Sequence, residues 1–198
     1  MKLYMSVNSP YVRIVRVMLR EMGTTPEVEE IEVNPRDPGT GFWSVNPVAR
    51  IPTLALPDGV VIAESDLICR YLDDRLGDGR FYAPLKNDPR RLSALGTAHA
   101  MLGRGVAARV DLQRPGGPDH KEYVETQLAG VIRGADALDQ LPAEAINTPD
   151  IADIAVTCMV EWLNFRHPDV NVLAGRPSLE NWCRQVGERE SMATTRPH

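Results

Sequence analysis

The sequence predicts two domains, an α/β domain over residues 1–77 and an all-helical domain over residues 91–198. Strand and helix patterns alternate up to residue 77, whereas no convincing strand pattern follows residue 90. The residues between the two domains, 78–90, are polar and contain both glycine and proline, which is typical of a linker.

The first domain begins with a strand–helix–strand pattern. Residues 2–5 (KLYM) and 28–33 (VEEIEV) fit short strands. Pro10 suits the first position of the helix between them, because that position needs no backbone N–H, and Gly23 is a typical helix end. The apolar residues of this helix fall at helical spacing, while its arginines lie on another face. The apolar set is Val12, Val15, Met18, Leu19 and Met22, and the basic set is Arg13, Arg16 and Arg20.

The rest of the first domain predicts a hairpin and a second helix. Residues 34–47 are rich in proline and glycine and predict an irregular stretch with at most a short helix. Residues 51–56 and 60–63 flank a Pro-Asp-Gly turn and predict a β-hairpin. Apolar residues at helical spacing then follow Glu64 and end at Gly77. The expected order is strand–helix–strand, an irregular stretch, and strand–strand–helix.

The second domain predicts only helices. Residues 91–112 and 120–140 form two long helical patterns on either side of a break, and the last helix is expected to begin at Ser178 as its N-cap. The most apolar helix opens at Asp150, and Asp153 lies at the third helical position. This spacing resembles a capping box, so we interpret the two carboxylates as a folding device rather than as a catalytic pair.

Composition excludes several classes of function. The 198 residues are 43% hydrophobic and 25% charged, as in an ordinary globular protein, and the net charge of −5 argues against nucleic-acid binding. No apolar run approaches the roughly 18 residues of a membrane span, and the N-terminus has no signal-peptide pattern, so we expect a cytoplasmic protein. Cys69, Cys158 and Cys183 make neither a CxxC pair nor a zinc pattern, which predicts three buried reduced thiols and no metal.

Four stretches together resemble the glutathione S-transferase superfamily, in particular its small bacterial members with a serine at the active-site helix. They are SPYVRIVRV (9–17), NPVARIPTL (46–54), ESDLICRYLDD (64–74) and DIADIAVTCMVEWL (150–163), and the C-terminal RPSLENWCRQVGERESMATTRP also looks like the family. The resemblance implies a thioredoxin-like N-terminal domain that binds glutathione, a helical domain that carries the co-substrate site, and a homodimer.

Ser9 is the catalytic residue that this resemblance implies. It precedes Pro10 directly, at the place of the nucleophile in the Cys-Pro-Tyr pattern of glutaredoxin-like relatives. A thiol with a reference pKa of about 8.5 is mostly protonated at neutral pH, and a hydroxyl donor at a helix N-terminus favours its anion. Two alternatives remain open: Ser9 is only an N-cap, or the role belongs to Ser6 or Asn8.

The peptide Ile51–Pro52 is expected to bind the cysteinyl part of glutathione. A proline at the start of a central strand removes a ladder donor, and a cis bond would turn the backbone of Ile51 outward. In the family that backbone pairs with glutathione like an added strand. An ordinary trans proline at the first strand position is the alternative.

The dipeptide Glu64-Ser65 is expected to bind the γ-glutamyl end of glutathione. A carboxylate accepts from an ammonium group, and a serine hydroxyl at a helix N-terminus can hold a carboxylate. Asp66 is expected to help at the same end. Ser65 can also be a helix cap alone. Arg50 is a candidate for the glycyl carboxylate, with a solvated surface side chain as its alternative.

The co-substrate pocket is expected to involve Tyr11, Met101, Arg104 and Ala108. The last three lie about one turn apart in the first long helix, which faces the second substrate in the family. His99 lies in the same region and is more typical of a packed or exposed histidine than of a catalytic base.

The resemblance predicts a glutathione transferase, which activates glutathione as its thiolate and adds it to a small hydrophobic electrophile. One alternative is a non-catalytic glutathione-binding or interaction protein on the same fold. Another is a glutathione-dependent reductase or dehalogenase. A reductase needs a nucleophilic cysteine at the start of the helix, and Ser6, Asn8 and Ser9 count against it.

Overall fold

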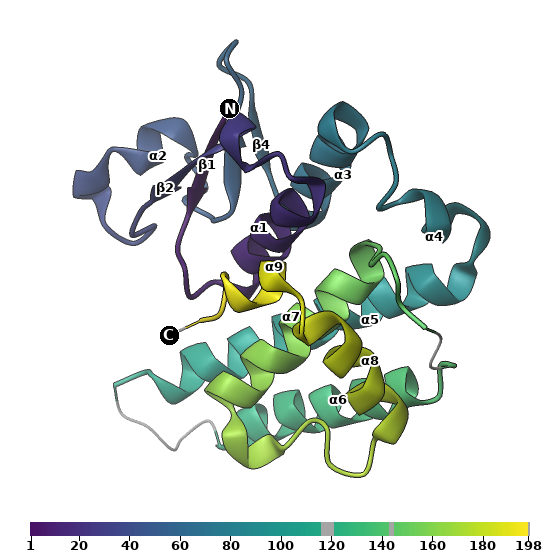
Figure 1. Cartoon of the computed structure of the whole chain (residues 1–198). Helices are drawn as coiled ribbons and strands as arrows, with labels where there is room; N and C mark the ends of the chain where they lie inside the picture. The colour runs from purple at the N-terminus through teal and green to yellow at the C-terminus, as the bar shows by residue number, and fades with distance from the viewer. Residues whose placement is uncertain (116–120, 143–144, 198) are drawn as a thin grey trace. The chain divides into compact units, whose positions relative to one another are not determined.

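A computed structural model of the chain describes residues 1–115, 121–142 and 145–197, which divide into two compact units. The first unit contains Met1–Ala83 together with the residues from Glu190 onward, and the second is Pro84–Arg189 (Figure 1). These limits differ from the expected domains of 1–77 and 91–198 with a linker at 78–90. The difference has a physical cause, because Phe81 and Tyr82 hydrogen-bond to the first unit and the C-terminal residues pack on its first helix.

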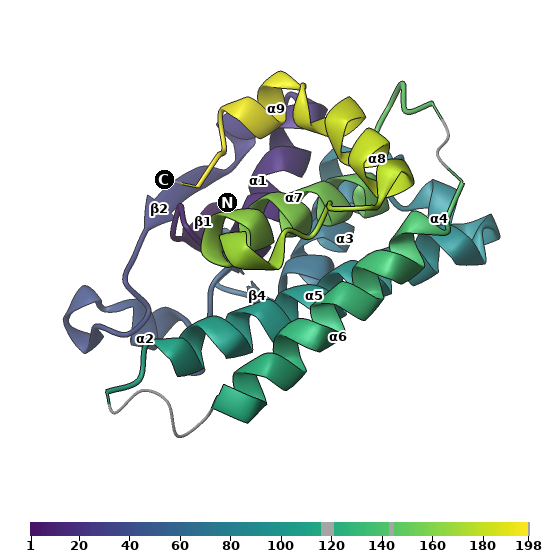
Figure 2. The same cartoon turned by 90° about the horizontal axis from the view of Figure 1, so that it is seen from below.

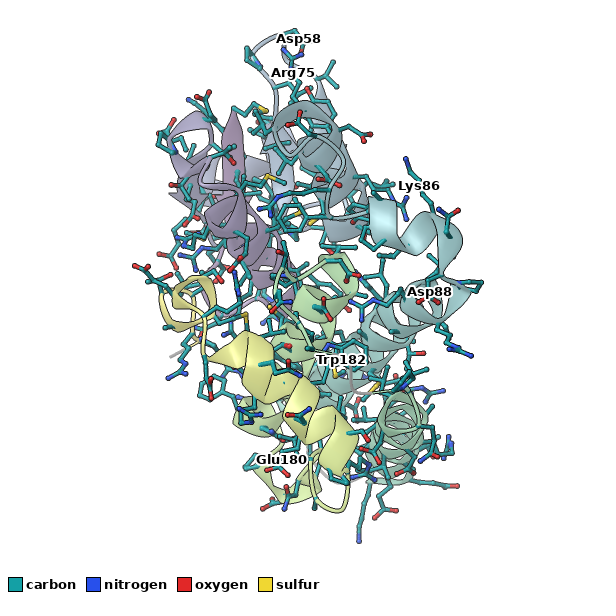
Figure 3. The ribbon with its side chains drawn as sticks, turned by 45° about the vertical axis from the view of Figure 1, so that its right-hand side comes forward. Asp58, Arg75, Lys86, Asp88, Glu180 and Trp182 are labelled. Atoms are coloured by element: carbon teal, nitrogen blue, oxygen red, sulfur yellow. The ribbon has the colours of Figure 1, made fainter. Side chains whose placement is uncertain are left out.

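The sheet of the first unit has the four predicted strands. They are β1 (Lys2–Met5), β2 (Glu29–Glu32), β3 (Thr53–Ala55) and β4 (Val61–Ala63), in the order β2-β1-β3-β4. β1 is parallel to β2 and antiparallel to β3, and β3 is antiparallel to β4. The β3–β4 hairpin is therefore confirmed, and Asp58 lies at its tip (Figure 3).

The helices of the first unit are α1 (Pro10–Met22), α2 (Phe42–Val45) and α3 (Ser65–Leu76), with 3-10 turns η1 (Thr25–Glu27) and η2 (Pro38–Thr40). Gly23 ends α1 in the left-handed conformation at φ 71°, as its sequence position predicts. α1 and α3 pack together. Leu3 and Met5 are buried on one face of β1. On the other face, the ring of Tyr4 packs against the ring of Phe42 of α2, with 5.5 Å between the ring centroids. The first unit is a mixed sheet with helices on it, as predicted.

The basic residues of α1 are buried (Arg13 and Arg16) or half-buried (Arg20) and have polar partners. Arg13 is 1% exposed, and its Nη2 donates to the carbonyl of Met192 at 3.1 Å. This contact belongs to α9 (Glu190–Ala193), which lies beside α1 (Figure 1). Arg16 and Arg20 each donate to Glu30 at 2.8 Å. Burial raises the pKa of Glu30, but the two guanidinium groups outweigh it and hold that pKa below its usual value.

The second unit is helical, as predicted. Its elements are α4 (Ala83–Asn87), which begins at the last residue of the first unit, α5 (Pro89–Leu112), α6 (Lys121–Asp139), α7 (Ile151–Arg166), η4 (Pro168–Val170) and α8 (Pro177–Gly187). α5 and α6 run side by side (Figure 2), and α7 packs against both α5 and α8. The predicted N-cap at Ser178 is wrong. Pro177 takes the first helical position, so Ser178 lies inside the first turn and Arg176 is the capping residue.

The capping box at the start of α7 is confirmed. The Asp150 carboxylate accepts from the backbone N–H groups of Ala152 and Asp153 at 2.8 and 3.0 Å, and the Asp153 carboxylate accepts from the N–H of Asp150 at 2.9 Å. Arg91 of α5 pairs with both carboxylates at 2.6 and 2.7 Å. Trp182 on α8 (Figure 3) donates its indole N–H to Asp153 at 2.7 Å. The box therefore joins three helices of the second unit.

Cys69, Cys158 and Cys183 are buried and form no disulfide bond, as predicted. Within the ranges that the structure describes, no helix is both long and apolar enough to cross a membrane. The same ranges contain no group of three or more His, Cys, Asp or Glu residues placed to hold a metal ion.

Candidate functional site

The register of the sheet brings three loop segments to one end of the first unit. Tyr4 of β1 lies opposite Thr53 of β3, and Thr53 lies opposite Ala63 of β4, both in antiparallel pairs. Because of this pairing, the residues after β1, before β3 and after β4 meet at the same end of the sheet. These residues are Ser6–Ser9, Arg50–Pro52 and Glu64–Ser65, so the predicted glutathione-site residues converge in space.

Ser9 is the N-cap of α1. Its hydroxyl oxygen accepts from the backbone N–H of Val12 at 3.4 Å, which is a long hydrogen bond, and its own N–H donates to the Ser6 carbonyl at 3.0 Å. A hydroxyl that accepts through its oxygen still has its hydrogen to donate. The capping role is therefore compatible with donation to an anion at the start of the helix.

The Ile51–Pro52 peptide bond is cis, as expected. The paired residues of β3 begin at Thr53, so the backbone of Ile51 lies beyond the antiparallel pairing with β1 and β4. Arg50, directly before it, is exposed.

Asn46 and Thr53 hold the loop before β3 in place. The sequence analysis assigned neither residue a role. Asn46 is 4% exposed, and its Nδ2 donates to the Arg50 carbonyl at 3.2 Å and to the Thr53 hydroxyl oxygen at 2.8 Å. The hydroxyl of Thr53 donates in turn to the Arg50 carbonyl at 2.7 Å. Both residues lie in the NPVARIPTL stretch, where an amide and a hydroxyl beside the two prolines were the only hint in the sequence. They hold the backbone that leads into Ile51.

Glu64 has an unusual backbone for a residue with a side chain, with φ 70° and ψ 124°. Such conformations cost about 1–3 kcal/mol and persist only where the surroundings enforce them, often at functional sites. Glu64 is the N-cap of α3 and its carboxylate makes no capping hydrogen bond. Ser65 is the first helical residue and is 3% exposed, so the alternative in which Ser65 merely caps the helix is wrong.

Tyr11 lies near two of these residues. Burial raises the pKa of its phenol, the charge of Arg50 acts to lower that pKa, and the charge of Glu64 acts to raise it. The Tyr11 hydroxyl is therefore within electrostatic range of both side chains. The sheet register independently places the start of α1, the loop before β3 and the start of α3 at one end of the sheet.

The three predicted co-substrate residues of α5 pack largely inside the second unit. A Cβ at Gly134 of α6 would lie 2.6 Å from Cγ of Met101, and a Cβ at Gly130 would lie 2.6 Å from Cδ of Arg104. Ala108 is fully buried. These contacts turn Met101 and Arg104 toward α6. Their place in a co-substrate pocket stays a prediction, and the packing argues against it for Met101 and Ala108.

A cavity of about 540 Å³ lies elsewhere in the second unit, between the end of α5 and the start of α6. Its described lining residues are Ala107, Val110, Asp111, Arg114 and Tyr123. The carboxylate of Asp111 is buried and pairs with the exposed guanidinium of Arg114 at 3.2 Å. None of the predicted co-substrate residues is among these lining residues.

Comparison with known families decides what these segments belong to. The model of the glutathione S-transferase N-terminal domain matches residues 8–75, and that of the C-terminal domain matches residues 121–185. The chain belongs to the glutathione S-transferase family. Its two units therefore correspond to the family's two domains, and the fold class predicted from the sequence is confirmed.

Several relatives of known structure were crystallised with glutathione or a derivative. A glutathione transferase family member from Pseudomonas fluorescens Pf-5, with bound S-(propanoic acid)-glutathione, is 31% identical over the full length of both chains, with a TM-score of 0.85. A glutathione S-transferase from Methylobacillus flagellatus KT, with glutathione bound, is 30% identical over 100% of this chain and 99% of its own, with a TM-score of 0.87.

The curated relatives include both a GST-like protein and a stringent starvation protein A homologue. The GST-like protein YibF of Escherichia coli K12 is 28% identical over 100% of this chain and 98% of its own length. A stringent starvation protein A homologue of Haemophilus ducreyi is 40% identical, but over only 38% of this chain and 34% of its own. Family membership is therefore shown, while the activity within the family is a matter for proposal.

Proposed function

We propose that this chain is a glutathione transferase, which activates glutathione as its thiolate and adds it to a small hydrophobic electrophile. The observation that carries the proposal is the sheet register, which brings Ser9, Ile51–Pro52 and Glu64–Ser65 to one end of the sheet. The glutathione bound to relatives that match the whole chain supports the same assignment.

Each part of glutathione then meets a group suited to it. The backbone of Ile51 pairs with the cysteinyl residue like an added strand. Glu64 accepts from the γ-glutamyl ammonium, while Ser65 and the N-terminus of α3 hold its carboxylate. Arg50, being exposed, pairs with the glycyl carboxylate.

Ser9 stabilises the thiolate in this proposal. Its hydroxyl hydrogen is available because the cap bond to Val12 uses the oxygen. The N-terminus of α1 adds a favourable potential for an anion. Together these groups raise the thiolate fraction without redox chemistry of the protein.

The co-substrate is proposed to approach the sulfur beside Tyr11, which lies within electrostatic range of Arg50 and Glu64. The place of Arg104 of α5 in the co-substrate site stays a prediction. The Pseudomonas relative binds glutathione with a three-carbon acid on its sulfur. That ligand supports a site that accepts a small substituent at this position.

The test of the proposed function separates the two roles of Ser9. A charge-assisted hydrogen bond is worth about 1.5–3 kcal/mol, so Ser9→Ala should lower the rate of conjugation to 1-chloro-2,4-dinitrobenzene roughly 10- to 100-fold and raise the pH midpoint of that rate. Ser9→Asp keeps a good N-cap but has no donor, and should be equally inactive. Ser9→Thr keeps both functions and is the matched control.

The outcome for neighbouring residues decides the assignment. If Ser9→Ala conjugates at the wild-type rate while Ser6→Ala or Asn8→Ala does not, the thiolate role belongs to that neighbour. A wild-type protein that neither binds immobilised glutathione nor conjugates the aryl halide would contradict the proposed activity altogether.

A non-catalytic binding protein is the second candidate function. It is favoured by the match to the stringent starvation protein A homologue, a relative whose name does not describe a transferase, over 38% of this chain. Retention on immobilised glutathione without any conjugation of aryl halides would support this candidate over the first.

A homodimer in the cytoplasm completes the proposal. Three buried cysteines that form no disulfide bond are typical of a reducing compartment. Sedimentation at micromolar concentration should give twice the 21.9 kDa mass of one chain, and a monomer alone would contradict the dimer.

A further inference from the structure

The first turn of α3 is tied to a residue near the end of the first unit. Tyr82 is 7% exposed, and its hydroxyl donates to Asp66 Oδ1 at 2.8 Å. Asp66 directly follows Glu64-Ser65, the dipeptide proposed to bind the γ-glutamyl group. A buried phenol therefore holds the residue next to that site.

The second oxygen of the same carboxylate is also engaged. Arg70 donates from Nε to Asp66 Oδ2 at 2.9 Å, and its guanidinium carbon lies 4.4 Å from the centre of the Tyr82 ring. The three side chains form a closed group in which each contacts the other two. Asp66 was expected to help bind glutathione. In the structure, both of its carboxylate oxygens instead accept hydrogen bonds from Tyr82 and Arg70.

Tyr82 is also anchored at the other end of α3. The carboxylate of Asp73 is fully buried and accepts from the backbone N–H groups of Phe81, at 3.1 Å, and Tyr82, at 2.9 Å. Asp66 and Asp73 are seven residues apart, or about 10 Å along a helix. The backbone of Tyr82 is therefore fixed at the later part of α3, and its side chain reaches back to the first turn.

We propose that Tyr82 is a positioning residue that holds the Glu64–Ser65 turn in the geometry that binds the γ-glutamyl group. The unusual φ of 70° at Glu64 needs support from its surroundings, and the Tyr82–Asp66 hydrogen bond supplies it two residues further along. Tyr82 and Arg70 also offset the negative charge of Asp66 beside the place where the γ-glutamyl carboxylate binds. This inference rests on the proposed function.

Tyr82 lies at the junction between the two units along the chain. Tyr82 lies one residue before the end of the first unit, where the chain passes into the second. The Tyr82 side chain therefore links the end of the first unit to the first turn of α3.

The first measurement is glutathione binding by titration calorimetry on the full chain. Tyr82→Phe removes one hydroxyl and keeps the ring under Arg70, so the dissociation constant and KM for glutathione should rise about fivefold or more, with kcat at saturation changed by less than about twofold. Tyr71→Phe on the same helix is the matched control and should leave both unchanged. Adding Tyr82→Phe to Asp66→Ala should change the dissociation constant little further, because Asp66→Ala already removes the acceptor of the Tyr82 hydroxyl.

The second measurement needs no ligand. The amide of Ile68 donates to the Glu64 carbonyl at 3.0 Å, so its hydrogen exchange reports whether the first turn of α3 is formed. Tyr82→Phe should speed this exchange by about tenfold while the amides of α1 keep their rates. Equal acceleration in α1 and α3 would show a merely structural role and overturn the inference.

The outcomes separate the two proposals. Failure of the wild-type chain to bind glutathione would refute the proposed function. Normal wild-type binding, with an unchanged dissociation constant and unchanged Ile68 exchange in Tyr82→Phe, would refute the positioning role and leave the function standing.

Discussion

Replacing Arg91 by methionine removes the only cation from the contacts that join Asp150 and Asp153, as far as the described residues show. These two carboxylates are 5% and 2% exposed, and Arg91 lies 2.6 and 2.7 Å from them. Breaking a buried ion pair by removing one partner costs about 3–5 kcal/mol. Because the Arg91 side chain is itself 23% exposed, we expect a loss near the lower limit, about 3 kcal/mol of unfolding free energy.

Changes at Asp150 should cost less, in a defined order. Asp150→Ser keeps an N-cap oxygen and leaves Arg91 and Asp153 as a balanced pair, so we expect a loss of about 1 kcal/mol. Asp150→Ala also removes the cap, which adds about 1 kcal/mol. The expected order of destabilisation is Arg91→Met, then Asp150→Ala, then Asp150→Ser.

The assay is urea unfolding at pH 7, followed by tryptophan fluorescence. Trp182 donates to Asp153, so it reports on this part of the second unit directly. An Arg91→Met variant within about 0.5 kcal/mol of the wild type would refute the reasoning, as would a larger loss in Asp150→Ser than in Arg91→Met.

The stability that Arg91 contributes through Asp150 and Asp153 should depend on pH. Burial, with the charge of Asp150, raises the pKa of Asp153 above its ordinary 3.8. The folded chain therefore takes up this proton at a higher pH than the unfolded chain does, which favours folding as the pH falls toward 3.8. The cost of Arg91→Met should accordingly shrink between pH 7 and pH 4.5, and a cost that grows over this range would contradict the assignment.

Deleting the residues after Arg189 removes the Met192 and Thr195 acceptors of buried Arg13, and should destabilise the first unit by about 2 kcal/mol or more. A thermal midpoint equal to that of the full chain would contradict this. His167 donates from Nε2 to the Gly105 carbonyl at 2.9 Å, and its burial lowers its pKa below 6.5. Its share of the stability is thus present above pH 6.5 and is lost as the pH falls below it. The urea concentration at the unfolding midpoint should fall in the wild type as the pH is lowered from 7.5 to 5.5, and should fall less in His167→Gln. Equal pH dependence of the two midpoints would contradict this role of His167.

Local signals in the sequence predicted the elements of the fold well. Pro10 and Gly23 bound α1, and Asp150 with Asp153 forms the capping box of α7. These signals act within about one helical turn, so no distant contact is needed to read them. The prediction for Ser178 failed within the same range, because the neighbouring Pro177 is the stronger signal for the first helical position.

The segments of the candidate site were proposed from the sequence, and their role in binding glutathione stays a prediction. Family motifs indicated Ser9, Ile51–Pro52 and Glu64–Ser65, and the sheet register brings their segments together. The supporting residues Asn46 and Thr53 were not predicted, because a buried amide and hydroxyl look like ordinary loop residues until their partners are known.

The sequence by itself determined the order of the elements, the places where helices begin and end, and the motifs that carry the family. Each of these depends on neighbours along the chain. Only the tertiary structure decided that Arg13 is buried against Thr195, that Tyr82 holds Asp66 and that Met101 packs on α6. Helical periodicity shows that Arg13 shares a face with other arginines, but not which segment covers that face. The partner that buries it lies 182 residues away, and only the folded chain brings the two together.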